Sequence, residues 1–175
     1  GAESLVVHAR TKQDGYKPPA RWEWLARIRE QLSIPVIANG EVWTLDDYIG
    51  IRAVSACDDV MLGRGAVADP LLALRIRRWQ GEPAGVAGNV DYADAAAADW
   101  AAVLPLIGRF WTRVNAKLAP QHTPGRLKQW LGLMRRAYPQ AEVLYQHLRP
   151  LRDAAAIDAA LQAQGLPLAA LRRAA

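Results

Sequence analysis

The sequence contains 175 residues, of which 51% are hydrophobic and 22% charged, and this composition can build a packed core in one domain or two small ones. The net charge is +5, and the chain has neither an uninterrupted apolar run of about 18 residues nor a signal-peptide pattern, so we expect a cytoplasmic protein without a membrane span. The single cysteine, Cys57, excludes an internal disulfide, and the spacing of His8, His122 and His147 predicts no metal site.

Short apolar runs alternate with helical patterns in the first half of the chain. The runs are nearly continuous in aliphatic residues, which is typical of parallel strands covered on both faces. Thr44 is a candidate N-cap for the second helix. The order predicts right-handed crossovers in a parallel α/β sheet or barrel. In chain order, the predicted elements are strand Ser4–His8, helix 21–32, strand Pro35–Ala38, helix 44–54, strand Asp59–Leu62 and helix 70–79.

Glycine and proline residues at 81–88 interrupt this pattern. We therefore place a domain boundary there, between residues 1–82 and residues 83–175. Every element predicted beyond it is a helix, so the second domain is expected to be a helical bundle. The predicted helices are about 92–118 with Pro105 as a candidate kink, 124–137, 140–149, 153–164 and a short one after 165–167.

Basic residues concentrate in the second half. Residues 1–82 hold eleven Lys and Arg against eleven Asp and Glu, whereas nine basic residues face one acidic residue, Glu142, between Arg109 and Arg152. Clustered cations of this kind indicate a polyanion partner such as a nucleic acid. A solvated basic helix face remains the alternative from charge alone.

Polar and glycine residues follow each of the three predicted strands. In parallel α/β folds, ligands bind at the carboxyl ends of the strands. Glycines let backbone amides approach an anion closely, and Arg64 between two glycines is well placed for a phosphate. Taken singly, each motif also fits an ordinary turn, and His8 also fits a hydrogen-bonded core histidine. The three segments are His8-Ala9-Arg10-Thr11, Asn39-Gly40-Glu41 and Gly63-Arg64-Gly65-Ala66.

Four motifs in order carry a family resemblance: His8-x-Arg10-Thr11 with Gly15-Tyr16, the runs 35–41 and 60–66, and Gly125–Leu131 followed by Leu144–Arg149. Together they resemble the bacterial tRNA-dihydrouridine synthases, and the last motif most resembles subfamily C. The resemblance covers essentially the whole chain. It implies the last three β/α units of a TIM-type (β/α)8 barrel, followed by a C-terminal helical domain that binds tRNA.

The resemblance also implies an activity and a set of site residues. Members of this family reduce a uridine of the tRNA D-arm to dihydrouridine with FMN and a nicotinamide cofactor, usually NADPH, and subfamily C acts on uridine 16. The residues that would bind FMN are His8 beside the isoalloxazine ring, and Asn39, Gly40, Glu41, Gly63 and Arg64. The residues that would contact tRNA are Tyr16, Arg126, Lys128 and Arg149.

The chain departs from the family in lacking counterparts of the first five β/α units. With them it lacks the catalytic cysteine, which Cys57 does not match, and a lysine that contacts the flavin. We therefore expect a C-terminal portion of the enzyme that has no catalytic residue and neither binds FMN tightly nor turns over by itself. Its exposed strand edges should lead it to dimerise, to swap segments or to rearrange its N-terminal half.

Two other functions fit parts of the sequence. A stand-alone RNA-binding module would explain the basic second half, but not the strand-end motifs. Another FMN- or phosphate-binding barrel oxidoreductase, acting on a small molecule, would explain those motifs but leave the basic helices unexplained.

Overall fold

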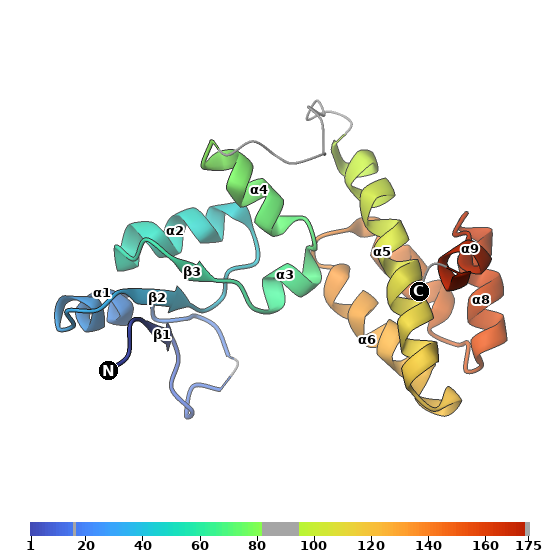
Figure 1. Cartoon of the computed structure of the whole chain (residues 1–175), viewed down its shortest axis with the longest axis horizontal. Helices are drawn as coiled ribbons and strands as arrows, with labels where there is room; N and C mark the ends of the chain where they lie inside the picture. The colour runs from blue at the N-terminus through green and yellow to red at the C-terminus, as the bar shows by residue number, and fades with distance from the viewer. Residues whose placement is uncertain (16, 82–94, 174–175) are drawn as a thin grey trace. The chain divides into compact units, whose positions relative to one another are not determined.

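The computed structural model describes residues 1–15, 17–81 and 95–173, and the chain divides into two compact units, residues 1–84 and 85–175 (Figure 1). The predicted boundary between residues 82 and 83 lies outside the described residues, as does the start of the predicted helix 92–118. Each unit is described by itself below.

The first unit contains a small parallel sheet with helices between its strands (Figure 1). The strand order is β1-β2-β3, and both neighbouring pairs are parallel. The β-α-β-α-β order expected from the apolar runs is therefore present, while the short helix α3 was not expected. Its elements are β1 Leu5–His8, α1 Trp22–Glu30, β2 Val36–Asn39, α2 Leu45–Ser55, β3 Val60–Met61, α3 Arg64–Ala68 and α4 Leu72–Trp79.

The core of the first unit lies between the sheet and its helices. Leu25 of α1, Ala38 of β2 and Ile51 of α2 are fully buried in it. The expectation that every strand is covered on both faces is wrong for β1, where Leu5 and Val6 remain 40% and 41% exposed. Within the described residues β1 is an edge strand that pairs with β2 alone, so fewer groups cover it.

Helix α2 begins with the cap that the sequence predicted. The Thr44 side chain accepts a hydrogen bond from the backbone N–H of Asp47, and the Asp47 carboxylate accepts one in return from the backbone N–H of Thr44. This reciprocal capping box satisfies donors that the first turn of a helix leaves unpaired. The cap fixes where α2 starts, immediately after the loop that leaves β2.

All described elements of the second unit are helical. Pro105 lies inside the long helix α5, Ala95–Lys117. Trp111 of the same helix is fully buried, and its Nε1 donates to Oδ1 of Asp158 on α8, Ala154–Ala163, at 2.7 Å. Among the described helices of the chain, none has both the length and the apolar character that a bilayer span requires. The elements are α5 Ala95–Lys117, the 3-10 helix η1 Pro120–His122, α6 Thr123–Met134, α7 Pro139–Leu148, α8 Ala154–Ala163 and α9 Leu168–Arg173.

Candidate functional site

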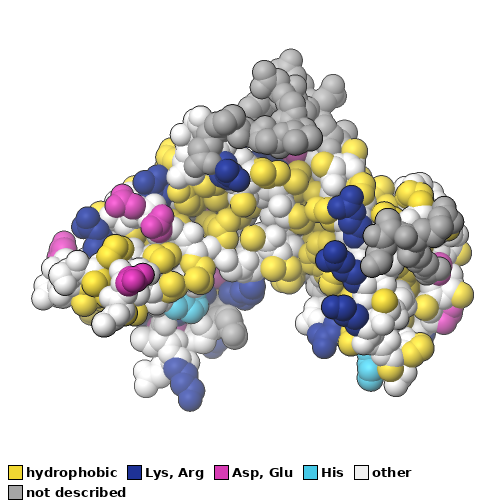
Figure 2. Space-filling view, viewed as in Figure 1, with side chains coloured by type: hydrophobic (Ala, Val, Ile, Leu, Met, Phe, Trp, Pro, Cys, Tyr) yellow, Lys and Arg dark blue, Asp and Glu magenta, His cyan; other side chains and the backbone are white. Residues whose placement is uncertain are grey.

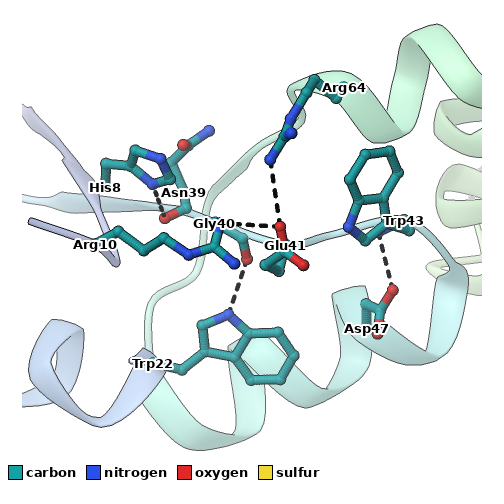
Figure 3. A network of polar contacts seen from close by, with 9 residues as sticks. All are labelled: His8, Arg10, Trp22, Asn39, Gly40, Glu41, Trp43, Asp47 and Arg64. Carbon is teal, nitrogen blue, oxygen red and sulfur yellow. Dashed lines mark hydrogen bonds and ion pairs between the residues drawn. The ribbon is translucent and has the colours of Figure 1, made fainter. Parts of the chain in front are cut away.

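The carboxyl ends of the three strands meet at one edge of the sheet. His8 lies opposite Asn39 in the β1–β2 register, and Asn39 lies opposite Met61 in the β2–β3 register. Figure 3 shows His8, Asn39, Gly40 and Glu41 gathered at this edge. The structure thus brings together residues from strand-end segments that lie about thirty residues apart in the sequence, as the parallel topology requires.

His8 and Asn39 are joined through a backbone carbonyl. The Nδ1 atom of His8 lies 3.2 Å from the backbone oxygen of Asn39, and because a carbonyl oxygen only accepts, Nδ1 carries the proton in this contact. The Asn39 amide in turn donates to the backbone oxygen of Met61 at 2.9 Å. His8 is exposed, which argues against the core-histidine alternative.

The turn that follows β2 is tightly fixed. Gly40 adopts a φ of +145°, and a Cβ added there would stand 3.0 Å from the Cβ of Ala9. Glu41 has a φ of 55°, which is uncommon for a residue other than glycine. The indole Nε1 of Trp22 donates to the backbone oxygen of Gly40 at 2.8 Å. These contacts hold the backbone in a conformation that directs the Glu41 side chain toward two arginines (Figure 3).

Glu41 is the shared partner of Arg10 and Arg64. Its Oε1 atom lies 2.9 Å from Nη1 of Arg10 and 3.4 Å from Nη2 of Arg64. The Arg10 side chain is only 1% exposed, whereas that of Arg64 is 44% exposed. The Arg64 guanidinium also lies 5.2 Å from the ring centroid of Trp43, within cation–π range. One arginine is therefore buried and structural, while the other reaches the surface.

The environment of Glu41 favours its ionised form. Burial of the carboxyl group opposes ionisation, but hydrogen bonds from Arg10 and Trp43 and the charges of Arg10 and Arg64 outweigh it and hold the pKa of Glu41 below its usual range. Arg10 keeps two buried nitrogens, Nε and Nη2, without a hydrogen-bond partner among the described residues. The Arg10–Glu41 ion pair thus holds this edge of the sheet together.

The two glycines that flank Arg64 have different surroundings. A Cβ added at Gly65 would lie 1.9 Å from the backbone oxygen of Val42, so only glycine fits where α3 packs against the loop after β2. A Cβ added at Gly63 would meet no atom within 4 Å. Gly65 is therefore required by the packing of the chain itself, and the space beside the Gly63 backbone is open.

The basic residues singled out in the second unit differ in exposure. Arg126 and Arg149 are exposed, and Arg126 donates from Nη1 to the side-chain oxygen of Gln129 at 3.3 Å. Lys128 is half-buried, and its Nζ lies 3.0 Å from the backbone oxygen of Arg149. Lys and Arg side chains gather along one face of this unit in Figure 2, whereas both signs of charge are mixed over the first unit. Tyr16, the remaining residue of this set, lies outside the described residues.

Two contributions to the strand-end site did not follow from the sequence. Arg10 belongs to the motif His8-x-Arg10-Thr11, but no role of its own followed from the sequence. Its hydrogen bond to Glu41 joins residues 31 positions apart in the chain. Trp22 has the apolar character of a core residue at the start of a helix, yet its N–H fixes the Gly40 turn. The position of Arg10 next to a predicted strand was a signal for a charged partner, because a charge that becomes buried needs one, whereas Trp22 carried no such signal.

Other reactive groups in the described part of the chain form no second site. Cys57 is buried, with its Sγ 3.8 Å from the backbone oxygen of Ser55. Within the described residues, no group of three or more His, Cys, Asp or Glu side chains is arranged to hold a metal ion. The strand-end residues are therefore the candidate site of the first unit.

Comparison with known proteins identifies similar sequences. The family model described as dihydrouridine synthase matches residues 1–95. A protein of Ralstonia nicotianae named tRNA-dihydrouridine(16) synthase is 50% identical over 157 residues, which is 90% of this chain and 45% of that protein. Proteins of the same name from Pseudomonas putida and Cupriavidus necator are 48% identical over 90% of the chain and 46% identical over 97% of it. The chain spans about half the length of these curated relatives.

Proposed function

Because the chain belongs to the dihydrouridine synthase family, we propose that it is the C-terminal portion of a flavin-dependent tRNA-dihydrouridine synthase that reduces uridine 16 of tRNA. The observation that carries this proposal is the 50% identity, over 90% of the chain, to a relative named for that position. In this proposal the three β/α units complete a TIM-type barrel. The helical unit binds tRNA, and such a substrate implies a cytoplasmic location.

The strand-end residues fit an FMN group. Open space beside the Gly63 backbone and the exposed Arg64 guanidinium suit a phosphate, which needs close amide approach and a fork of N–H donors. The exposed ring of His8 and the residues Asn39–Glu41 at the same edge suit the flavin ring and its ribityl chain. When bound, FMN supplies hydride transfer between NADPH and the uracil ring.

The residues of the chain orient the reactants in this proposal. Glu41 keeps Arg64 near the phosphate position through the ion pair at 3.4 Å, and Arg10 anchors Glu41 from the buried side. The Asn39 carbonyl sets the direction of the His8 ring. The acid that protonates the uracil ring would not be Cys57, because that thiol is 2% exposed and packed in the core.

The helical unit would hold the RNA while its target base is out of the stack. An enzyme that acts on a base of a folded nucleic acid must first extrude that base, and contacts to the RNA backbone fix its position meanwhile. The proposed contacts are the exposed Arg126 and Arg149, the half-buried Lys128, and Tyr16 of the first unit.

The activity is tested with the gene product that contains this sequence. We expect the purified protein, given FMN, NADPH and an unmodified tRNA transcript, to form dihydrouridine at position 16, as measured by mass spectrometry of nuclease fragments. Dihydrouridine at another position, with position 16 unchanged, would contradict the assigned site. NADPH oxidation that depends on a small molecule and ignores tRNA would favour the alternative oxidoreductase.

The proposed tRNA binding is tested on the chain itself. We expect its affinity for tRNA to fall steeply as salt rises, because cations on the protein displace counterions from phosphates. Arg126→Ala should weaken binding and reduce the slope of log affinity against log salt by about one. Arg29→Ala is the matched control, because Arg29 is an exposed arginine on α1 in the charge-balanced unit. Binding that responds to neither salt nor Arg126→Ala would contradict the RNA assignment.

Flavin binding distinguishes the proposed function from the remaining alternative, a stand-alone RNA-binding module. We expect the chain alone to show no stoichiometric flavin absorbance and no turnover, and the complete gene product to carry flavin. A gene product that binds tRNA but never takes up flavin would favour the stand-alone RNA-binding module.

A further inference from the structure

The aromatic ring of Trp43 lies beside Arg64 at the strand-end site. The guanidinium carbon of Arg64 is 5.2 Å from the centroid of the Trp43 ring, and Nη2 of the same guanidinium lies 3.4 Å from Oε1 of Glu41. Figure 3 shows the Arg64 side chain reaching from α3 toward both groups. An indole attracts a cation at this distance through the negative charge of its face. Two groups of different chemistry therefore restrict the direction of the Arg64 side chain.

The backbone of Trp43 is fixed from two sides. Its N–H donates to Oδ2 of Asp47 at 2.9 Å, so the residue is tied to the capping box of α2. On the other side, α3 packs so closely that a Cβ added at Gly65 would lie 3.1 Å from the Cα of Trp43. Trp43 is thus an anchored and half-buried residue, whereas Arg64 ends in a long side chain with several rotatable bonds.

An arginine that binds an anion gains from being held in place beforehand. The Arg64 side chain is 44% exposed, and its rotamer freedom would be lost when a ligand binds. Fixing a side chain in its bound direction reduces that cost. Glu41 holds the guanidinium, but its negative charge opposes that of a phosphate. The Trp43 ring restricts the same guanidinium without a formal negative charge, which suits an arginine that must remain available to an anion.

We propose that Trp43 is a positioning residue for the flavin phosphate, because its ring holds the Arg64 guanidinium, and that it thereby favours FMN over riboflavin, which lacks the phosphate. The inference rests on the proposed function, which supplies the flavin. It assigns a role to a residue outside the motif runs 35–41 and 60–66. The simpler interpretation is that Trp43 only covers the loop after β2, and then it would affect both flavins equally.

The test compares two flavins on the flavin-free gene product that contains this sequence. The dissociation constant of riboflavin divided by that of FMN isolates the phosphate, because the ring system and the ribityl chain are common to both. Arg64→Met should reduce this ratio by about thirtyfold, as expected for lost hydrogen bonds to a charged group. Trp43→Leu should reduce it by roughly threefold to fivefold, the size of a partly exposed cation–π contact, through weaker FMN binding alone. Titration followed by flavin fluorescence measures both constants.

A conservative variant and a double variant separate positioning from packing. Trp43→Phe retains an aromatic face, so it should keep at least half of the wild-type ratio. In the Arg64→Met background, Trp43→Leu should change the ratio by less than about 1.5-fold, because no guanidinium remains to be held. Trp24→Leu is the matched control. Trp24 of α1 makes a similar contact with Arg27, at 4.8 Å, outside the strand-end segments, so its loss should leave the ratio unchanged.

A change to the ring alone keeps the test decisive if Trp43→Leu does not fold. Site-specific fluorination of the Trp43 ring lowers the negative charge of its face with little change of shape. It should therefore reduce the ratio by at least about twofold while thermal unfolding stays as in the wild type. An unchanged ratio in the fluorinated protein would overturn the role of Trp43.

The remaining outcomes separate this inference from the proposed function. Equal weakening of FMN and riboflavin by Trp43→Leu, or an undiminished loss in the Arg64→Met background, would overturn the positioning role while leaving flavin binding in place. An unchanged ratio in Arg64→Met would overturn the phosphate contact on which that role depends. A gene product that binds neither flavin would overturn the proposed function itself.

Discussion

At the scale of single residues, Glu41 belongs both to the turn that follows β2 and to the ion pairs with Arg10 and Arg64. Its positive φ follows the fixed Gly40 turn, and its carboxylate is held between a buried and an exposed arginine. Left-handed backbone at a residue other than glycine persists where the surroundings impose it, and such residues cluster at ligand sites. The stability of the first unit should therefore depend on the ionisation of this one carboxyl group.

Glu41→Gln tests that dependence. The variant leaves the Arg10 guanidinium buried without a counter-charge, so it should lower the free energy of unfolding at pH 7 by about 3 kcal/mol. Because the pKa of Glu41 is lowered in the folded chain, its contribution is complete above its ordinary value of 4.5 and is lost as the pH falls through the folded pKa. The wild type and the variant should therefore converge in stability in acid.

Chemical denaturation at a series of pH values measures this convergence. Asp58→Asn serves as the control, because Asp58 is an exposed acid outside the Arg10–Glu41–Arg64 cluster. A Glu41→Gln variant that stays as stable as the wild type at pH 7 would contradict the role of the ion pair.

At the scale of elements, the turn from β3 into α3 contains two glycines of unequal importance. Gly65→Ala should lower the free energy of unfolding by about 1–3 kcal/mol, because its Cβ would collide with the Val42 carbonyl and force the loop after β2 away from α3. Gly63→Ala should cost less, roughly 1 kcal/mol, because its Cβ meets open space and only its backbone (φ −111°, ψ −121°) lies outside the α and β regions of L residues. Thermal unfolding of the two variants measures the contrast, and equal losses would contradict it.

The sequence predicted the order of strands and helices because apolar runs and helical periodicity are local signals. It did not predict α3, because Arg64–Ala68 contains a glycine and follows another, a composition typical of turns. The strand-end residues followed from the rule that parallel strands present their ends together. The Arg10–Glu41 pair did not, because only the tertiary fold joins residues 31 positions apart. For Lys128, the family resemblance implied an RNA contact, but the sequence contained no information on its backbone carbonyl partners.

At the scale of the whole chain, we propose that the edge strand β1 provides a route to self-association. An edge strand with free backbone groups and half-exposed Leu5 and Val6 is a template for pairing with a second copy. We expect sedimentation velocity to show concentration-dependent dimers. Val6→Lys should shift the protein toward monomer by placing a charge on the edge.

Val143→Lys is the matched control for this prediction. Val143 is a 72% exposed valine on α7, where no strand edge is available, so the same substitution should leave the dimer unchanged. A wild-type chain that stays monomeric at every concentration would contradict association through β1.

The hydrogen bond from Trp22 to the Gly40 carbonyl gives the molecule an internal spectroscopic reporter. Of seven tryptophans in the chain, this one donates its indole proton directly to the turn that follows β2. In a ¹⁵N-labelled sample of the gene product that contains this sequence, its indole resonance, assigned by comparison with Trp22→Phe, should move when flavin mononucleotide binds the proposed strand-end site. Occupancy of the strand-end site can thus be followed by one nuclear signal, without any turnover.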